Sequence, residues 1–194
     1  MKNGILNSIF SSFLYVEDLN LDLKTIKDYC LKLKSDSDGR KISNIHGWQS
    51  EDLQGEIPEL NDLFLEMDKH LNIVAANIPV KKGKRLSLLN SWINVNDNPS
   101  CYNKPHSHPG SMLSGVFYTD DFDDSNITFI NPSPAHAHVF DGQNIGDINK
   151  FTSGFFHCKP RSNRMIIFPS YLQHYVEPSN SSKNRITIAF NSSN

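Results

Sequence analysis

The sequence predicts an α+β protein that is mainly β, with helices in its first half and strands in its second half. Two observations support this class. Apolar residues recur every three or four positions in residues 20–34 and 57–77, whereas from Arg85 onward short segments alternate between apolar and polar residues. Because the helices precede the strands, we expect helices that cover one face of an antiparallel sandwich or barrel.

The first part of the chain, about residues 18–80, is the expected helical brace. In the first predicted helix, 20–34, the apolar positions are Leu21, Leu23, Ile26, Tyr29, Cys30 and Leu33. In the second predicted helix, 57–77, they are Leu60, Leu63, Phe64, Met67 and Leu71. The segment IFSSFLYV at 9–16 precedes both helices and is typical of an edge strand.

The second part, about residues 85–191, is the expected β core. Five segments have strand character: RLSLLNSWINVN at 85–96, SMLSGVFYT at 111–119, ITFIN at 127–131, RMIIFPS at 164–170 and RITIAFN at 185–191. Clusters of Asn, Asp, Gly, Pro and Ser separate them. A chain of 194 residues buries roughly 70 % of its surface, so we expect one domain over 1–194.

Composition argues against several partners. Lys and Arg number 19 against 21 Asp and Glu, so no basic stripe for nucleic acid is expected. No apolar run approaches the roughly 20 residues of a membrane span, and the N-terminus lacks a cleavage-site pattern. Cys30, Cys101 and Cys158 have no CxxC spacing, which favours a reducing cytoplasm over a disulfide framework. A homodimer is left open.

Three histidines are candidates for a metal site. His106 and His108 lie two residues apart, and in an extended strand such side chains share a face. A pair of this kind also occurs on the polar face of a strand or in a loop without any metal. His174 follows the segment 164–170, where the mouth of a barrel is expected, so it is the candidate for a third ligand.

Arg185 is a candidate for anion binding. It opens the last predicted strand and shares a face with Thr187 and Ala189, whereas the alternate residues of that strand are apolar. A buried guanidinium requires an anion, and a carboxylate matches its geometry. The alternative is an arginine at a strand end that reaches solvent or pairs with an aspartate.

The order of these residues resembles the iron(II)- and 2-oxoglutarate-dependent oxygenases, which have a double-stranded β-helix fold. Their pattern is HxD or HxE, then a distal His, then a basic residue roughly ten positions later. Five segments resemble a bacterial and viral branch of these oxygenases, with some likeness to prolyl 4-hydroxylases: GWQS at 47–50, SWINVN at 91–96, HSHPGSMLSGVFY at 106–118, FPSYLQHYVEP at 168–178 and RITIAFN at 185–191.

The resemblance implies a role for each candidate. His106 and His174 would bind Fe(II), and His108 stands where the family normally has a carboxylate. Arg185 would bind the distal carboxylate of 2-oxoglutarate, assisted by the hydroxyls of Tyr118 and Thr187. The implied enzyme is a cytoplasmic dioxygenase that uses Fe(II), 2-oxoglutarate and dioxygen. It would hydroxylate a C–H bond of a peptide, prolyl or small-molecule substrate and release succinate and carbon dioxide.

Two other functions remain open at this point. A histidine in place of the carboxylate also suits a non-catalytic, cupin-like module that binds metal or a small molecule, and a zinc hydrolase with three histidine ligands. Asp120 and Asp121 are secondary candidates for a carboxylate ligand, and His136 and His138 form a second HxH that we leave out of the site. The segments 97–105 and 131–160 are expected to be loops that line the entrance.

Overall fold

The computed structural model describes residues 5, 8–78, 80–81, 83–133, 147–149, 151–181 and 183–193. It contains the α-helices α1 (Leu23–Asp36) and α2 (Asn61–Asn77), and the 3-10 turn η1 (Pro58–Leu60). Its strands are β1 (Tyr15–Asp18), β2 (Asn44–Ile45), β3 (Trp48–Gln49), β4 (Leu88–Asn96), β5 (Tyr102–His106), β6 (Leu113–Tyr118), β7 (Ile127–Ile130), β8 (Phe155–Cys158), β9 (Arg164–Pro169), β10 (His174–Val176) and β11 (Arg185–Ser192).

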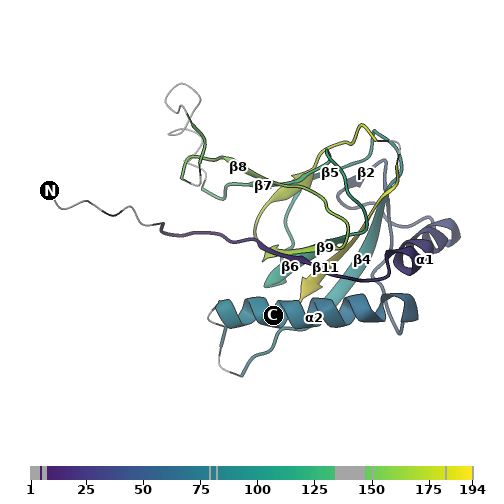
Figure 1. Ribbon diagram of the computed structural model, residues 1–194, viewed down its shortest axis with the longest axis horizontal. Helices are drawn as coiled ribbons and strands as arrows, with labels where there is room; N and C mark the ends of the chain where they lie inside the picture. The colour runs from purple at the N-terminus through teal and green to yellow at the C-terminus, as the bar shows by residue number, and fades with distance from the viewer. Residues whose placement is uncertain are drawn as a thin grey trace.

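The strands form two antiparallel sheets that face each other, and the helices cover the outside of one of them (Figure 1). The six-stranded sheet has the order β1-β9-β6-β11-β4-β3, and the five-stranded sheet has the order β2-β5-β10-β7-β8. This arrangement confirms the predicted α+β, mainly β class. It also creates an enclosed space between the sheets, on the side away from the helices.

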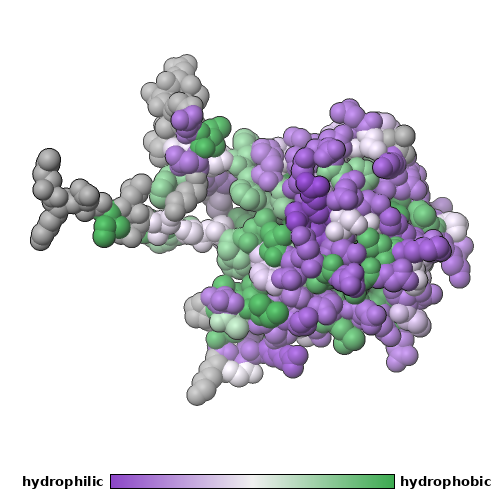
Figure 2. Space-filling view, viewed as in Figure 1, coloured by the Kyte–Doolittle hydropathy of each residue, from purple (hydrophilic) through white to green (hydrophobic). Residues whose placement is uncertain are grey.

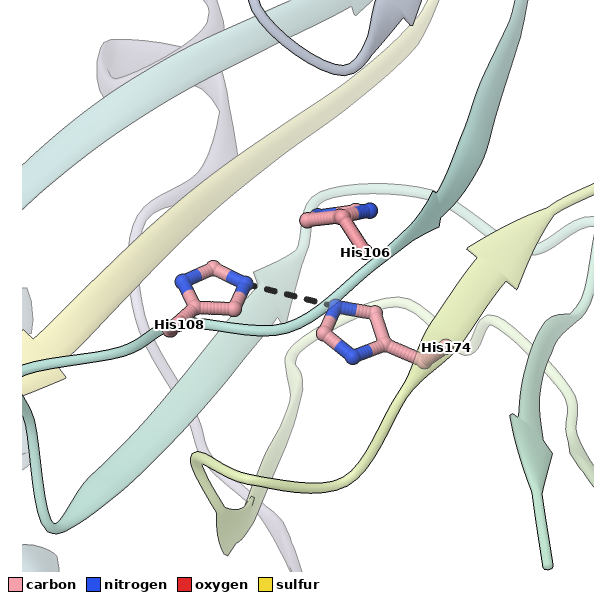
Figure 3. Close-up of side chains that lie close together, drawn as sticks. All are labelled: His106, His108 and His174. Atoms are coloured by element: carbon pink, nitrogen blue, oxygen red, sulfur yellow. Dashed lines mark hydrogen bonds between the residues drawn. The ribbon is translucent and has the colours of Figure 1, made fainter. Parts of the chain in front are cut away.

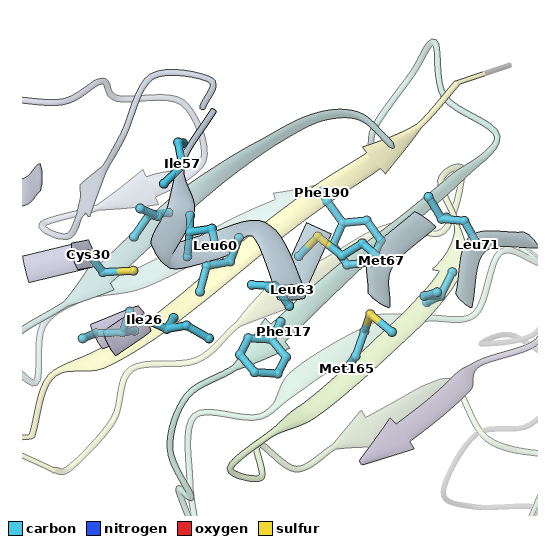
Figure 4. Close-up of a cluster of buried hydrophobic side chains, with 14 of the residues drawn as sticks. Ile26, Cys30, Ile57, Leu60, Leu63, Met67, Leu71, Phe117, Met165 and Phe190 are labelled. Atoms are coloured by element: carbon cyan, nitrogen blue, oxygen red, sulfur yellow. The ribbon is translucent and has the colours of Figure 1, made fainter. Parts of the chain in front are cut away.

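The helices pack on the six-stranded sheet through a continuous apolar core (Figure 4). Leu63 and Met67 of α2 are buried with Phe117 of β6 and Phe190 of β11. Burial of each such side chain contributes roughly 1.5 to 3 kcal/mol relative to exposure. The helical spacing in the sequence therefore identified the face of α2 that contacts the sheet.

The observed helix boundaries differ slightly from the predicted ones. The Asp22 carboxylate accepts hydrogen bonds from the backbone of Lys24 and Thr25, at 3.0 and 3.3 Å, and so caps α1. The helix therefore begins at Leu23 rather than near residue 20. Pro58 starts the short η1 turn, so the predicted helix at 57–77 divides into η1 and α2.

The last strand, β11, separates the apolar core from the space between the sheets. Ile186, Ile188 and Phe190 point into the core beneath the helices. Arg185, Thr187 and Ala189 point to the opposite face and line a pocket between the sheets. The two faces predicted for this strand are confirmed.

Several short strands were not predicted. The segment of β5 contains Lys104 and Pro105, and β8 lies within residues 131–160, which were expected to form a loop. The expected strand at 9–16 was also too long, because only β1 pairs, although its edge position is confirmed. In each case pairing with a neighbouring strand, rather than local sequence, decides the conformation.

Two expectations from composition can be compared with the structure. The three cysteines are free and buried, so no disulfide framework forms. Among the described residues, no helix has the length and hydropathy needed to cross a bilayer.

Candidate metal centre

Three histidines converge at the mouth of the space between the sheets (Figure 3). His106 is the last residue of β5, and His174, the first residue of β10, is its direct cross-strand partner. His108 follows two residues after His106. One ring nitrogen from each histidine lies within 4.8 Å of the others, so all three can contact one ion.

Backbone carbonyls orient two of the rings. The carbonyl oxygen of Lys104 lies 2.8 Å from Nδ1 of His106, and that of Leu172 lies 2.9 Å from Nδ1 of His174. Because a carbonyl only accepts, each Nδ1 carries the proton and each Nε2 keeps its lone pair. This is the arrangement of metal-binding histidines whose second nitrogen donates to a carbonyl.

The backbone brings His108 beside His106 and His174 in a different conformation from the predicted extended strand. It lies beyond the end of β5, so an unbroken strand does not place it beside His106. Its backbone N–H donates to the carbonyl of Ser170, at 3.0 Å, which holds the chain as it leaves the strand. Its ring stacks between Trp92 and His174, with centroid separations of 5.5 and 5.2 Å.

Burial keeps these imidazoles neutral. It lowers the pKa of His106, lowers the pKa of His108 to about 4 and lowers that of His174 to about 3. The neighbouring histidines lower the pKa of His108 and His174 further, because a second positive charge nearby is unfavourable. A site that resists protonation in this way suits a metal cation, which needs the neutral ring.

Within the described part of the chain, no carboxylate belongs to this group of candidate ligands. Asp120 pairs with Lys27 at 2.6 Å, and Asp121 accepts a hydrogen bond from the backbone of Ser162 at 3.1 Å, so both secondary candidates are engaged elsewhere. The second HxH, His136 and His138, lies outside the described residues.

Arg185 lies in the same pocket as the histidines and makes no salt bridge with a described residue, although the charge of Asp124 acts on it from a distance. Its side chain is 3 % exposed, and its Nε has no acceptor. Burial lowers the pKa of Arg185, and a buried guanidinium without a carboxylate is costly. The predicted alternatives, an arginine that reaches solvent or pairs with an aspartate, are therefore not what the structure shows.

Two hydroxyl-bearing residues lie beside Arg185. Tyr118 and Thr187 are direct cross-strand partners on β6 and β11, and both line the pocket. The guanidinium carbon of Arg185 lies 5.6 Å from the centroid of the Tyr118 ring. Burial raises the pKa of Tyr118, whereas the neighbouring Arg185 guanidinium lowers it. The buried hydroxyl has no acceptor for its proton, so it is available as a donor.

The structure adds two polar residues that sequence reasoning missed. Asn94 and Asn96 lie on the same face of β4, opposite Thr187 and Arg185 respectively. The Asn94 Oδ1 atom and both polar atoms of the Asn96 amide are buried without partners. The alternation in SWINVN was the available signal, because it places these amides on the face away from Ile93 and Val95. This polar, cationic pocket beside three imidazoles fits a dicarboxylate that also contacts a metal.

Comparison with known proteins agrees with this chemistry. A family model described as "Putative 2OG-Fe(II) oxygenase" matches residues 90–191, which is more than half of the chain. No curated protein matches the chain by sequence.

Solved structures share the fold. A prolyl-4-hydroxylase from Pseudomonas putida aligns with a TM-score of 0.62 and 11 % identity, over 93 % of this chain and 92 % of that one. HygX from Streptomyces hygroscopicus, with nickel and 2-oxoglutarate bound, aligns with a TM-score of 0.64 and 14 % identity, over 94 % and 83 %. A prolyl hydroxylase from Trichoplax adhaerens, in complex with a peptide fragment of hypoxia inducible factor, aligns with a TM-score of 0.62 and 11 % identity, over 92 % and 82 %.

These similarities confirm the double-stranded β-helix fold predicted from the resemblance. They also favour an oxygenase over the zinc hydrolase and the non-catalytic module, since the family match covers the strands that contain the histidines and Arg185. The chain belongs to the 2OG-Fe(II) oxygenase family and is an enzyme that uses Fe(II) and 2-oxoglutarate.

Proposed function

We propose that His106, His108 and His174 hold the ferrous ion of this oxygenase, and that the enzyme hydroxylates a C–H bond of a peptide or small molecule. One observation carries the proposal: three imidazole nitrogens lie within 4.8 Å of one another in a pocket that also contains the unpaired Arg185. When bound, the iron supplies the oxidative chemistry, in which 2-oxoglutarate, dioxygen and R–H give succinate, carbon dioxide and R–OH.

The protein's contribution is orientation. The carbonyls of Lys104 and Leu172 fix the tautomers of His106 and His174, so both rings present Nε2 without rearrangement. Trp92 holds the ring of His108 by stacking. Ligands that are already aligned reduce the entropy lost when the metal binds.

Arg185 supplies the charge that recognises the co-substrate. We assign the distal carboxylate of 2-oxoglutarate to this guanidinium, with the hydroxyls of Tyr118 and Thr187 as additional donors. The unpartnered Nε of Arg185 and hydroxyl of Tyr118 support this assignment, because both gain a partner when a carboxylate binds.

The imidazole of His108 changes the charge of the site. With a carboxylate at that position, a ferrous site has a net charge of about +1, whereas three neutral imidazoles leave the full +2 charge of the ion. A more positive site attracts the 2-oxo acid more strongly but retains the metal less well. Divalent metals bind to sites made of three histidines, so a histidine in place of the carboxylate is compatible with turnover.

The proposal leaves the reacting substrate as a peptide or a small molecule. Both kinds of ligand occur among proteins of this fold, in the peptide complex of the Trichoplax adhaerens hydroxylase and in the hygromycin B complex of HygX. The three free, buried cysteines support a reducing compartment as the site of action.

Succinate formation tests the proposed function. The purified protein, loaded with Fe(II) without oxygen and then exposed to air and 2-oxoglutarate, should release succinate, since many such sites turn over slowly without substrate. His174→Ala should abolish the release, whereas the control His157→Ala should not, because His157 lies on the exposed surface of β8. Equal succinate release by His174→Ala would show that the iron is held elsewhere.

A further inference from the structure

A second and larger cavity opens beside the metal centre, between residues 8–14 and the hairpin of β7 and β8. We call it the entrance groove. Its volume is about 900 Å³, and its main apolar residues are Phe10, Phe13, Leu14, Phe129, Phe156 and Leu172. Figure 2 shows apolar side chains on the flank from which these two segments extend.

The chemistry of the entrance groove favours an uncharged occupant. The described residues that line it are apolar apart from Ser, Asn and Pro. None of them is Asp, Glu, Lys, Arg or His, whereas 21 % of the residues in the whole chain are charged. Phe10 is 99 % exposed and Phe156 is 58 % exposed, so large apolar surfaces face water there. Apolar surface of this extent on a groove favours an uncharged, apolar ligand.

The entrance groove adjoins the metal centre, with Phe129 and Leu172 between them. The ring of Phe129 lies in the groove and is 5.7 Å from the ring of His174. Leu172 also lines the groove, and its carbonyl accepts the hydrogen bond that orients His174. A molecule bound in the groove therefore lies beside the metal centre, and this position favours the substrate as its occupant.

The strand beside the groove, β8, has an outer edge that pairs with no strand in the described part of the chain. It is the last strand of its sheet. The Asn131 N–H donates to the Gly154 carbonyl at 2.9 Å. Two residues further along, Phe156 pairs with Phe129. The backbone N–H and C=O groups of Gly154 and Phe156 therefore face β7. By alternation, the backbone groups of Phe155 and His157 face outward.

The outward backbone groups of Phe155 and His157 differ in whether they already have hydrogen-bond partners. The hydroxyl of Ser153 bonds to both the N–H and the carbonyl of Phe155. No described residue pairs with the outward N–H and carbonyl of His157, which are free to accept another strand. The side chain of the preceding residue, Phe156, lies on the same face as Phe129, toward the barrel interior.

We propose that the entrance groove receives an extended, apolar segment of a polypeptide substrate, which adds to the outer edge of β8 as a further strand. This inference rests on the proposed function, because it takes the residue beside the metal as the reacting one. Side chains on the barrel-facing side of the segment lie beside Phe156. From a strand added outside β8 to β10 is three strand spacings, about 14 Å, which an extended chain covers in about four to five residues.

The test uses a randomised library of ten-residue peptides, selected against the full chain loaded with Mn(II) and N-oxalylglycine, an inert analogue of 2-oxoglutarate. Selected peptides should carry apolar residues at positions i and i+2, without charge at either. Their affinity, measured by fluorescence anisotropy, should fall at least tenfold with Phe156→Ser. The control Leu89→Ser, at a site that is 59 % exposed on β4 and outside the groove, should change it less than twofold.

Two further comparisons test the pairing with β8. His157→Pro removes the outward N–H and should reduce affinity at least tenfold, whereas His157→Ala keeps the N–H and should not. N-methylation of alternate amides in a selected peptide gives the same information without altering the protein. One set of methylated positions should abolish binding and the other set should not.

Three results would overturn the inference. They are the absence of any selected peptide, binding that is unchanged by Phe156→Ser, and binding that tolerates N-methylation at every position. A concentration-dependent dimer that Phe156→Ser dissociates would instead assign the groove to a second copy of the chain. None of these results affects succinate release, so the peptide inference can fail while the proposed function stands. Absence of Mn(II) and N-oxalylglycine binding would reject the proposed function itself.

Discussion

The Nε2 atoms of His108 and His174 lie 3.3 Å apart, although 66 residues separate the two histidines in the chain. Two nitrogens bound to one ion at about 2.1 Å and at a right angle are about 3.0 Å apart. The metal-free arrangement is therefore close to the one that a shared ion requires. Because Nδ1 of His174 donates to Leu172, its Nε2 is the acceptor, and His108 provides the proton between the rings.

His108 is predicted to be a true ligand. His108→Ala should lower the affinity for Mn(II), measured by calorimetry, at least about tenfold, because loss of even an outer partner of a metal ligand costs that much. His108→Asp should still bind Mn(II), because it restores the carboxylate of the common oxygenase pattern.

The matched control for His108 is His157→Ala, which removes an imidazole bonded to Thr128 and distant from the cluster. It should leave the affinity for Mn(II) unchanged. If His108→Ala binds Mn(II) as tightly as the parent, His108 only packs beside the site and the ion has another ligand.

Arg185 is predicted to bind the co-substrate but not the metal. Arg185→Ala should weaken 2-oxoglutarate binding by about 2 to 5 kcal/mol, the cost of losing one partner of a buried charged pair. Mn(II) affinity should stay within twofold, because Arg185 is not among the candidate metal ligands. Arg164→Ala is the control, since Arg164 pairs with Asp18 at 2.7 Å on the surface. Unchanged 2-oxoglutarate affinity in Arg185→Ala would show that the carboxylate binds elsewhere.

Tyr118→Phe should change stability and co-substrate binding in opposite directions. The Tyr118 hydroxyl is buried and unpaired in the free protein, so its removal should raise the free energy of unfolding by up to about 1 kcal/mol. The same change removes a donor to 2-oxoglutarate and should weaken its binding by about 0.5 to 1.5 kcal/mol. Chemical denaturation and calorimetry measure the two effects. A loss of stability without loss of affinity would mean that the hydroxyl has a structural role only.

The metal-free protein should lose stability as the pH falls below 6.5. The pKa of His108 in the folded protein is about 4 and that of His174 is about 3, whereas an ordinary histidine has a pKa of 6.5. Between these values the unfolded chain binds protons that the folded chain does not, so the stability is complete above pH 6.5 and decreases toward pH 4.

At pH 5.5 the free energy of unfolding should be about 2 to 3 kcal/mol lower than at pH 7.5, since each histidine contributes about 1.4 kcal/mol per pH unit. Urea denaturation of the metal-free protein at both pH values measures the difference. The double variant His108→Gln/His174→Gln should lack most of it. An equal pH dependence in the parent and the double variant would contradict the neutral, buried state of these rings.

Local patterns in the sequence determined most of the secondary structure and the faces that it buries. The spacing of Leu63 and Met67 identified the buried face of α2, and the alternation after Arg185 identified which face of β11 meets the core. Both patterns reflect a repeat of the backbone itself, 3.6 residues in a helix and two in a strand, so they are visible without any knowledge of neighbouring segments. The residues proposed for the iron and the co-substrate were also named from their order along the chain.

Only the tertiary structure decided how those residues meet. His108 joins the cluster because its backbone bonds to Ser170 beyond the end of β5, and Asn94 and Asn96 face Thr187 and Arg185 because β4 pairs with β11 in one register. The edge of β8 is likewise a property of the sheet order. Contacts between residues distant in sequence depend on strand pairing and packing, which no local periodicity specifies. The candidate metal centre is therefore predictable as a set of residues, and the geometry in which those residues meet is a consequence of the fold.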